Sequence, residues 1–372
     1  MSQKHCVVIG SGIIGQAHAL EALEGGWKVT LLERDSRPLG ASVRNFGTLW
    51  PIGCRPGPER EQALYGVKRW RELAKDADFT IDPSGSLSLA HRDEAWRVLE
   101  EFGGEDGDFE LLSVGETIRR FPLANPVELR GSLFSPAETV VRPSSAMAAL
   151  TRYLTAQGVE MCFGTLVTKV LDACVETSQG DRIPFDQLVI AAGKEMRVLF
   201  PEELAAAGLH QSRLQMMRTR PLEAQQRLGA VMVGDLTLCH YPAFEKCPSI
   251  EALRERLKRE LPEHHAKGIH VIAAQHDDGS LTLGDSHEYG TDFEPGYDTQ
   301  VEAMILESLA EFTNLPPLAI SKRWQGIYLK STKGVTQVVL RPQENVTMIT
   351  AMGGLGMTLS WGLARRTVQS WS

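Results

Sequence analysis

Three glycines near the start of the chain have the spacing of a dinucleotide-binding turn. They belong to the segment GSGIIG, residues 10–15, which lies between an apolar run and a helix-forming run. Gly10 permits a tight turn, Gly12 lets a pyrophosphate approach the backbone, and Gly15 lets a helix pack closely on a strand. Glu33 follows at a position where a carboxylate can accept hydrogen bonds from a ribose. The pattern predicts a dinucleotide at the start of the helix, where the helix dipole favours anions.

A second candidate for chemistry is Arg44. It is the only charged residue in the run GASVRNFGTLWP, residues 40–51, which otherwise has the composition of a close-packed loop. An arginine left unpaired in such a loop costs free energy. We therefore expect Arg44 to face an anion, either on a cofactor or on a substrate. The alternative is a structural arginine that pairs with a carboxylate elsewhere.

Composition and charge restrict the class of protein. The chain has 372 residues, which predicts roughly two domains. Its formal net charge is −8 and its basic residues form no stripe, so we expect no nucleic-acid partner. No apolar run approaches the ~18 residues of a membrane span, and no secretion signal is visible, so we expect no membrane partner. The six scattered cysteines have no metal-ligand spacing, which favours reduced thiols, a cytoplasmic location and no metal site.

The elements that must position these residues begin as an α/β unit. Residues 6–9, 13–25 and 28–33 are predicted to form a strand, a helix and a strand. Residues 187–193, QLVIAAG, have the continuous apolar character of a strand that is covered on both faces. We also expect a helix at 59–77, short strands and helices over 85–133, a helix at 144–157, strands near 160–185, and a final strand, glycine loop and helix.

The chain changes in character from about residue 210 to residue 328. Alternating segments such as QMMRTR, TLCHYPAF, HVIAAQ and SLTLGDSH predict an antiparallel sheet. The residues around Asp277-Asp278-Gly279 predict the hairpin turn between the last two segments. A charged helix is expected at residues 251–260, most simply as a solvated face. The chain therefore contains an α/β part and a part built on an antiparallel sheet.

Four motifs together resemble those of the D-amino acid oxidase and glycine/sarcosine oxidase group of FAD-dependent enzymes. They are GSGIIGQAHALEALEGGWKVTLLERD, the loop GASVRNFG, the strand LVIAAG and the final MGGLGMTLSWGLA. They occur in the order typical of that group and extend over nearly the whole chain. The resemblance implies an α/β, two-domain fold, with a glutathione-reductase-like FAD-binding Rossmann domain and an antiparallel-sheet substrate domain. We assign residues 1–80, 140–200 and 325–372 to the FAD-binding domain and residues 81–139 and 201–324 to the substrate-binding domain.

The resemblance also implies the cofactor contacts. The glycine turn would contact the FAD pyrophosphate, Glu33 the ribose, Val167 the adenine end, and the last glycine loop the flavin ring. A helix that begins after Gly356 would direct its N-terminal dipole at the flavin. Relatives that attach flavin covalently through cysteine do so in the C-terminal third, and no cysteine follows Cys247, so we expect noncovalent FAD. The predicted cofactor-binding residues are Gly10, Gly12, Ile13, Gly15, Glu33, Arg34, Ser42, Arg44, Asn45, Gly47, Val167, Ala192, Gly193, Gly354, Gly356, Met357 and Thr358.

Two cations that bind a substrate carboxylate in this group are missing here. Glycine and D-amino acid oxidases use an arginine in a Gly-x-Arg-Pro segment, and the matching position holds Tyr328. Sarcosine oxidases use a lysine in the last glycine loop, where Thr358 stands. We therefore expect Arg44 to hold the substrate anion, because its planar fork matches phosphonate or phosphate oxygens. The motifs ASVRNFG and LGDSHEYG also resemble a subgroup associated with aminophosphonate breakdown.

The expected function is that of an FAD-dependent amine oxidase or dehydrogenase. It would oxidise the carbon–nitrogen bond of a small anionic amine, such as an N-methyl or hydroxy 2-aminoethylphosphonate, to an imine and then an aldehyde. Dioxygen, which would give hydrogen peroxide, or another acceptor would reoxidise the flavin. We predict catalytic roles for His287, Tyr328 and Arg44, and substrate contacts from the same residues together with His240 and Tyr241. For each histidine, and for Tyr241, a purely structural role is the alternative.

Two other functions stay open at this stage. One is a small amino acid or sarcosine-like oxidase whose substrate carboxylate is held by Arg44 or Arg341. The other is a flavin-holding subunit or assembly factor without turnover of its own. The sequence does not predict the oligomeric state.

Overall fold

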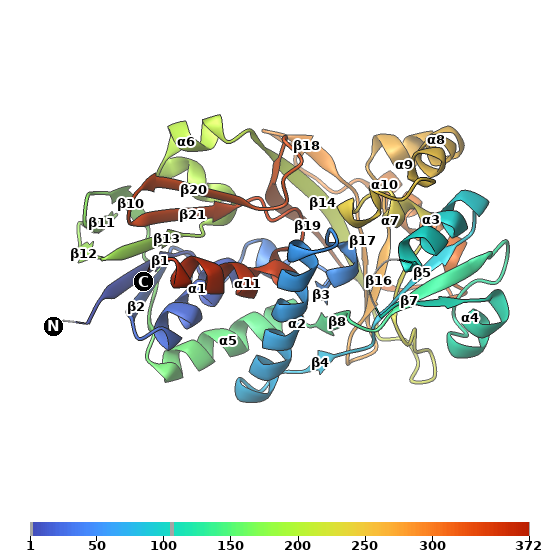
Figure 1. Ribbon diagram of the computed structural model, residues 1–372, viewed down its shortest axis with the longest axis horizontal. Coiled ribbons are helices and arrows are strands. Elements are labelled where there is room, and N and C mark those ends of the chain that lie inside the picture. The colour runs from blue at the N-terminus through green and yellow to red at the C-terminus, as the bar shows by residue number, and fades with distance from the viewer. Residues whose placement is uncertain (1–2, 105–107, 372) are drawn as a thin grey trace.

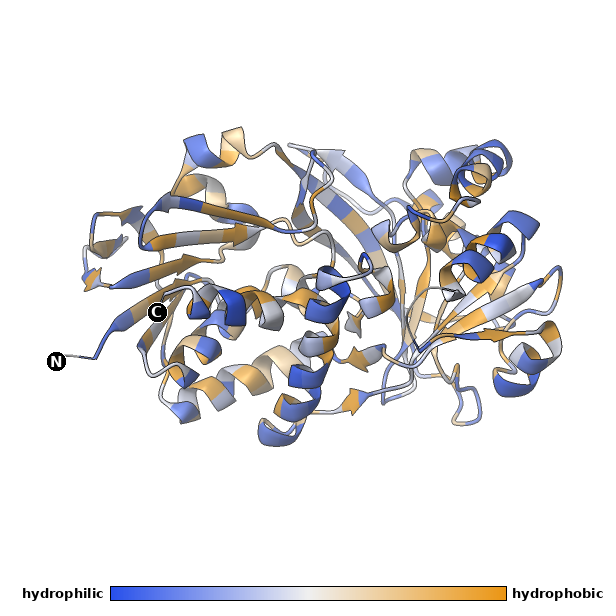
Figure 2. Cartoon of the chain, in the orientation of Figure 1, coloured by the Kyte–Doolittle hydropathy of each residue, from blue (hydrophilic) through white to orange (hydrophobic). Residues whose placement is uncertain are grey.

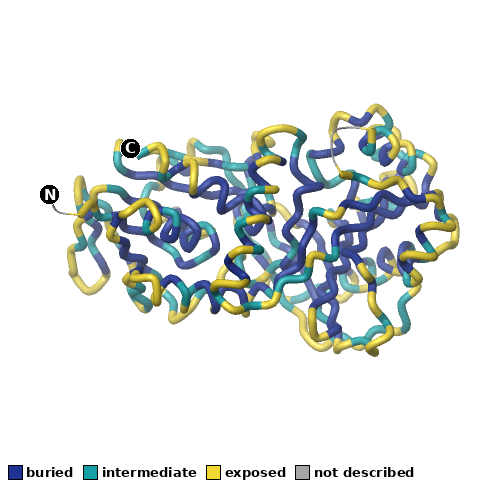
Figure 3. Tube along the Cα trace, turned by 60° about the horizontal axis from the view of Figure 1, so that its bottom comes forward, coloured by how far each residue is buried: buried dark blue, intermediate teal, exposed yellow. Residues whose placement is uncertain are grey.

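The computed structural model describes residues 3–104 and 108–371. These residues form two lobes, each built on its own large β-sheet (Figure 1). Buried segments lie inside each lobe, and exposed turns surround them (Figure 3). The predicted α/β, two-domain fold is confirmed, while the residue boundaries of the two domains stay a prediction.

The first lobe contains a six-stranded sheet with the order β20-β21-β13-β1-β2-β9. The strands from β21 to β9 are parallel, and β20 adds an antiparallel edge. The bounds are β1 (His5–Ile9), β2 (Lys28–Glu33), β9 (Glu160–Phe163), β13 (Gln187–Ile190), β20 (Val338–Gln343) and β21 (Val346–Thr350). The predicted strands at 6–9 and 28–33 are therefore confirmed, and the strand predicted at 187–193 is confirmed over residues 187–190.

Side chains of these strands alternate between two hydrophobic cores. In β1, Cys6 and Val8 pack in the core that helices line, whereas Val7 and Ile9 pack against a small three-stranded sheet. Apolar residues consequently follow one another along the strands, as the hydropathy colouring shows (Figure 2). The covering elements are α1 (Ile13–Glu24), α2 (Pro58–Asp76), α5 (Pro143–Gln157) and α11 (Gly356–Gln369) on one face, and β10 (Val167–Val170), β11 (Cys174–Thr177), β12 (Arg182–Pro184) and α6 (Pro201–Ala206) on the other.

The second lobe is built on a larger sheet with the order β18-β14-β17-β16-β15-β5-β7-β6, in which β19 also pairs with β14. Most neighbours are antiparallel, as predicted, but β15 and β5 are parallel. Their connection passes through the first lobe, so no hairpin forces them to be antiparallel. The bounds are β5 (Ser86–Ala90), β6 (Glu110–Leu112), β7 (Gly131–Ser135), β14 (Leu209–Thr219), β15 (Val231–Val233), β16 (Ile272–Gln275), β17 (Leu281–Gly284), β18 (Glu288–Gly290) and β19 (Ile320–Ser331).

Helices cover this second sheet, and short strands join the lobes. None of the described helices is both long and apolar enough to cross a bilayer. The helices are α3 (Asp93–Gly103), α4 (Val114–Arg120), α7 (Asp235–Leu238), α8 (Ile250–Glu260), α9 (Pro262–Ala266) and α10 (Thr299–Phe312), and the joining strands are β3 (Thr48–Leu49), β4 (Ile81–Asp82) and β8 (Thr139–Val141).

The hairpin prediction is confirmed, whereas one strand prediction is wrong. Strands β16 and β17 pair antiparallel across the turn at residues 277–279. The segment TLCHYPAF instead forms the end of α7 and a 3₁₀ turn at Pro242–Phe244. Pro242 has no backbone N–H for a strand ladder, so the apparent alternation there could not form a sheet. His240 and Tyr241 therefore come from a turn between two short helices.

Gly47 provides a test of the packing where the lobes join. It has a φ of +79°, and a Cβ atom there would lie 1.9 Å from the carbonyl oxygen of Val141. Gly26 has a similar φ of +83°, but nothing lies within 4 Å of its Cβ position. We expect Gly26→Ala to lower the unfolding free energy by about 1 kcal/mol, because only backbone strain is added. Gly47→Ala should cost at least about twice that in denaturant melts, since β8 must also move; equal losses would contradict this packing.

His18 links stability to pH. It is fully buried in α1, its Nδ1 lies 2.7 Å from the carbonyl oxygen of Ile14, and burial lowers its pKa to about 4. In the unfolded chain the pKa is about 6.5, so the unfolded state takes up a proton first as the pH falls. The stability from neutral His18 is therefore complete above pH 6.5 and is lost between pH 6.5 and 4, by up to about 3 kcal/mol.

We expect His18→Leu to make the fall of melting temperature between pH 6.5 and 4 shallower. The slope should not vanish, because burial also lowers the pKa of His276 to about 4. His265→Gln, at an exposed position, is the control and should keep the wild-type slope. An unchanged slope in His18→Leu would show that His18 does not contribute this linkage.

Candidate functional site

A cavity of about 630 Å³ lies between the two lobes. Its walls come from the glycine turn after β1, the loop after β2, the segment after β13, strand β19 and the start of α11. Residues from the large second sheet, among them Leu214 and Met216, close one end. The volume is within the range of about 300–1,000 Å³ that is typical of cofactor and ligand sites.

The glycine turn combines two packing contacts with one position that faces the cavity. Gly10 has a φ of +102°, and a Cβ atom there would lie 2.5 Å from the carbonyl oxygen of Ala191. A Cβ atom at Gly15 would lie 1.8 Å from the carbonyl oxygen of Gly10. Gly12 lines the cavity, and its Cβ position is 3.1 Å from the hydroxyl oxygen of Ser42. Gly10 and Gly15 therefore set the turn, and Gly12 leaves room for a group beside the backbone.

Glu33 is held in place at the cavity wall. Its Oε2 accepts hydrogen bonds from the backbone N and the hydroxyl of Ser11, at 2.8 and 2.7 Å. Its Oε1 accepts a hydrogen bond from the backbone N of Asp35 at 3.0 Å. The carboxylate is thus fixed at the end of β2, where sequence analysis expects a ribose contact.

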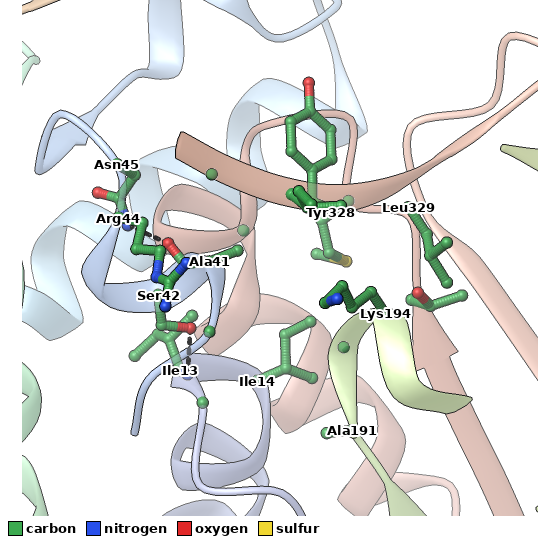
Figure 4. A pocket seen from close by; sticks show the side chains of 18 of the residues that line it. Ile13, Ile14, Ala41, Ser42, Arg44, Asn45, Ala191, Lys194, Tyr328 and Leu329 are labelled. Atoms are coloured by element: carbon green, nitrogen blue, oxygen red, sulfur yellow. Dashed lines mark hydrogen bonds between the residues drawn. The ribbon is translucent and has the colours of Figure 1, made fainter. Parts of the chain in front are cut away.

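Two helices begin at the cavity. Helix α1 starts at Ile13, whose backbone N donates to the Ser42 hydroxyl at 2.9 Å (Figure 4). Helix α11 starts at Gly356, and both Gly356 and Met357 line the cavity. Each helix start carries partial positive charge, which stabilises a neighbouring anion. Together with the open space at Gly12, these features fit a pyrophosphate at α1 and an electron-rich ring at α11.

Most residues of the predicted site are brought together. Those that line the cavity are Gly10, Gly12, Ile13, Glu33, Arg34, Ser42, Arg44, Asn45, Val167, Ala192, Gly193, His240, Tyr241, His287, Tyr328, Gly354, Gly356 and Met357. Three predicted cofactor residues, Gly15, Gly47 and Thr358, do not line it. Gly15 and Gly47 are needed for close backbone contacts. Thr358 is 1% exposed, and its hydroxyl accepts a hydrogen bond from the backbone N of Trp50 at 2.9 Å.

Three imidazoles stack at one end of the cavity. The ring centroids of His240 and His270 are 3.8 Å apart, those of His270 and His287 are 5.1 Å apart, and those of His240 and His287 are 4.5 Å apart. Asp285 lies beside them, with Oδ1 3.0 Å from His270 Nε2. Sequence analysis missed His270 and Asp285. The hairpin was the available signal, because these two residues are backbone partners across it.

Burial fixes the protonation of this end of the cavity. It lowers the pKa of His287 to about 4, although neighbouring Asp285 acts in the opposite direction, and it lowers the pKa of His240 well below its usual range. It raises the pKa of Tyr241 and of Tyr328 well above the usual range of a phenol. His240 and His287 are therefore neutral at pH 7, and both tyrosines keep their protons.

Tyr328 and His287 form a polar pair. His287 Nδ1 lies 3.2 Å from the carbonyl oxygen of Gly268, and with its proton there the Nε2 atom can only accept a hydrogen bond. The Tyr328 hydroxyl is 3.4 Å from His287 Nε2. It also lies 3.5 Å from the Cβ position of Gly354 in the last glycine loop. The pair thus connects the histidines with the start of α11.

Arg44 lines the cavity, but its loop is less closely packed than predicted. Its side chain is exposed, so water solvates the charge, and the loop does not close around it. One guanidinium nitrogen donates to the carbonyl oxygen of Gln325 at 3.3 Å, and Arg44 forms no ion pair with a described carboxylate. Figure 4 shows Arg44 and Ser42 on one side of the cavity and Tyr328 on another. The alternative anion partner Arg341 does not line the cavity and donates to Ser370 at 3.2 Å.

Comparison with known proteins identifies relatives of the chain. A protein-family model described as "FAD dependent oxidoreductase", abbreviated DAO, matches residues 5–370. Human mitochondrial sarcosine dehydrogenase is 27% identical over 178 residues, which are 45% of this chain and 19% of that protein. Glycerol 3-phosphate oxidase of Mycoplasma pneumoniae is 28% identical over 182 residues, 46% of this chain and 47% of that protein. The chain thus spans less than half the length of either curated relative.

A solved structure supports the fold. The crystal structure of glycine oxidase from Geobacillus kaustophilus superposes with a TM-score of 0.78. The superposition covers 100% of this chain and 96% of that chain, at 17% identity. The two-lobed architecture is therefore that of a known flavoenzyme fold, and FAD is the cofactor that the matched family description names.

The position of Gly12 at the cavity gives a direct test of the cofactor site. We expect Gly12→Val to abolish FAD retention, because the side chain would fill the space beside the backbone and press on Ser42. FAD released by acid precipitation, per mole of chain, is the measurement, and release from the wild type also tests noncovalent binding. Gly115→Val is the control, since nothing lies within 4 Å of its Cβ position and it does not line the cavity. A normal FAD content in Gly12→Val would show that this turn does not bind the cofactor.

Proposed function

Because the chain belongs to the DAO family of FAD dependent oxidoreductases, we propose that it oxidises the carbon–nitrogen bond of a small anionic amine, with an aminophosphonate as substrate. The observation that carries the proposal is the neutral Tyr328–His287 pair beside the start of α11. It offers a hydroxyl and an imidazole lone pair to an amine, and it offers no buried cation to a carboxylate. FAD, when bound, supplies the acceptor for a hydride from the carbon beside the nitrogen.

The cofactor would be held by backbone and polar groups. Gly12 and the start of α1 would receive the pyrophosphate, and Glu33 would accept hydrogen bonds from a ribose. The start of α11 would favour electron-rich density on the ring beside it. No cysteine is among the described residues that line the cavity, which supports noncovalent binding.

His287 would orient the amine. Hydride loss from a carbon requires a neutral nitrogen beside it, with its lone pair aligned. A base with a pKa of about 4 stores a proton poorly at pH 7, so we propose that His287 Nε2 accepts a hydrogen bond from the amine N–H. The amine would replace the Tyr328 hydroxyl, which lies 3.4 Å from Nε2, because this nitrogen has one lone pair, and the hydroxyl would then turn to the substrate. Loss of hydride from the neutral amine leaves a protonated imine, which would then react with water to give an aldehyde and a protonated amine.

Arg44 would hold the anion at the mouth of the cavity. Its guanidinium donates to the carbonyl oxygen of Gln325 at 3.3 Å, on β19, the strand that also carries Tyr328. Arginine binds tetrahedral oxyanions with two parallel hydrogen bonds. A relative supports such an anion, because its name, glycerol 3-phosphate oxidase, refers to a phosphate ester.

A sarcosine-like substrate is the second candidate, since another relative is named sarcosine dehydrogenase. Three substrates of equal chain length separate the possibilities. They are N-methyl-2-aminoethylphosphonate, N-methyl-β-alanine and the uncharged N-methylpropylamine. Under anaerobic conditions the preferred substrate should bleach the visible absorbance of the flavin fastest. Failure of all small amines to bleach it would contradict an amine oxidase, and exposure of the reduced protein to air would tell whether dioxygen accepts the electrons.

Arg44→Ala tests the anion contact. We expect the KM for the phosphonate to rise by about 10–100-fold, because charge-assisted hydrogen bonds contribute roughly 1.5–3 kcal/mol each. FAD content should stay normal, and the KM for N-methylpropylamine should not change. Arg341→Ala is the matched control, because that arginine lies outside the cavity. Equal losses on charged and uncharged substrates would assign Arg44 to the cofactor instead.

A further inference from the structure

Three histidines from separate segments converge at the closed end of the cavity. His240 lies in the turn after α7, His270 precedes β16, and His287 follows β17. One ring nitrogen of each lies within 4.8 Å of the others. The Tyr328–His287 pair uses only one of these rings, so the proposed function leaves the presence of His240 and His270 unexplained.

The ring nitrogens of His270 and His287, together with their neighbours, are arranged like those of histidines that bind a metal ion. His287 donates its Nδ1 proton to the carbonyl oxygen of Gly268, which leaves Nε2 unprotonated. His270 has Nε2 3.0 Å from Asp285, while its Nδ1 is buried without a hydrogen-bond partner. Histidines that bind metals commonly give their other nitrogen to a carboxylate or a backbone carbonyl, and both kinds of partner occur here.

Asp285 and His270 are buried together at this end of the cavity. Asp285 is 4% exposed, and His270 is 3% exposed. Asp285 Oδ1 lies 3.0 Å from His270 Nε2 and 3.8 Å from His287 Nδ1, beside two of the three rings. The other ring nitrogen of His270, Nδ1, is buried without a partner among the described residues, which costs free energy until a cation or a donor joins it.

We propose that His240, His270 and His287 bind one divalent transition-metal ion. Imidazole nitrogen favours ions such as Zn²⁺, and three histidines leave a fourth coordination position that here opens to the cavity. Zn–N bonds of about 2.0–2.1 Å place tetrahedral nitrogens about 3.3 Å apart. Because an imidazole binds a metal in the plane of its ring, the stacked rings must turn toward one another as well as draw together on binding. The sequence predicts no metal site because the three histidines have no short spacing, and only the fold brings them together.

Metal binding has a consequence for the amine. A metal ion on His287 Nε2 occupies the lone pair that the proposed function gives to the amine N–H. Zn²⁺ then acts as a reversible competitor of the substrate. This consequence rests on the proposed function, whereas the binding site itself rests only on the residues described above.

Equilibrium dialysis of the FAD-loaded protein against Zn²⁺ tests the site. After treatment with a chelator and desalting, the wild type should take up about one more Zn²⁺ per chain than His270→Ala or His240→Ala. Asp285→Asn should weaken binding by roughly 10–100-fold, since it removes a partner of a ligand. The FAD content and melting temperature of each variant show whether it is folded. If His270→Ala loses FAD, the zinc uptake of His240→Ala and Asp285→Asn tests the site instead.

His265→Ala and His276→Ala are the controls, one at an exposed position and one at a buried position outside the cluster. Both should bind as much Zn²⁺ as the wild type. Equal uptake by the wild type and the cluster variants, or no uptake by the wild type, would overturn the site. Initial rates supply the second readout, because Zn²⁺ should raise the KM of the amine without changing kcat. If Zn²⁺ binds without any effect on turnover, the metal site stands, and the proposed contact between His287 and the amine is wrong.

Discussion

The architecture depends on one close backbone contact, between Gly15 and the carbonyl oxygen of Gly10. A Cβ atom at Gly15 would lie 1.8 Å from that oxygen, so no other residue type allows α1 to begin so near the end of β1. This contact fixes where the start of α1 points. Helix α11 packs against α1, and its own start faces the same cavity. The positive ends of two helices therefore converge on the space into which Gly12 opens.

The second lobe supplies the histidine-lined end of the cavity through one hairpin. Antiparallel pairing of β16 with β17 makes His270 and Asp285 backbone partners, and the chain beyond Asp285 carries His287. Strand β19 pairs with β14 over its whole length and brings Tyr328 to His287. Sheet register, rather than any local motif, thus assembles the polar groups that would meet a substrate.

The sequence predicts well those structural features that depend on consecutive residues. The glycine turn, the strand at 187–190 and the hairpin at 277–279 depend on local backbone demands, and each was found. Roles that depend on distant partners could not be found in this way. Gly47 is required because the carbonyl oxygen of Val141 leaves no room for a Cβ atom. Thr358 accepts a hydrogen bond from the backbone N of Trp50. The loop around Arg44 was judged close-packed from composition, which cannot tell whether a long cation reaches water.

The two ends of the cavity differ in electrostatics, and this difference limits the substrate. Backbone dipoles at α1 and α11 stabilise the negative charge of a dinucleotide without any buried cation. At the other end, burial keeps His240 and His287 neutral, so a substrate anion placed there would lose its hydration and gain no positive charge from these two rings. An anionic amine is therefore accommodated only if its nitrogen enters first and its anion stays near solvent. The exposed position of Arg44 at the cavity wall satisfies that condition, which a buried arginine at the position of Tyr328 would not.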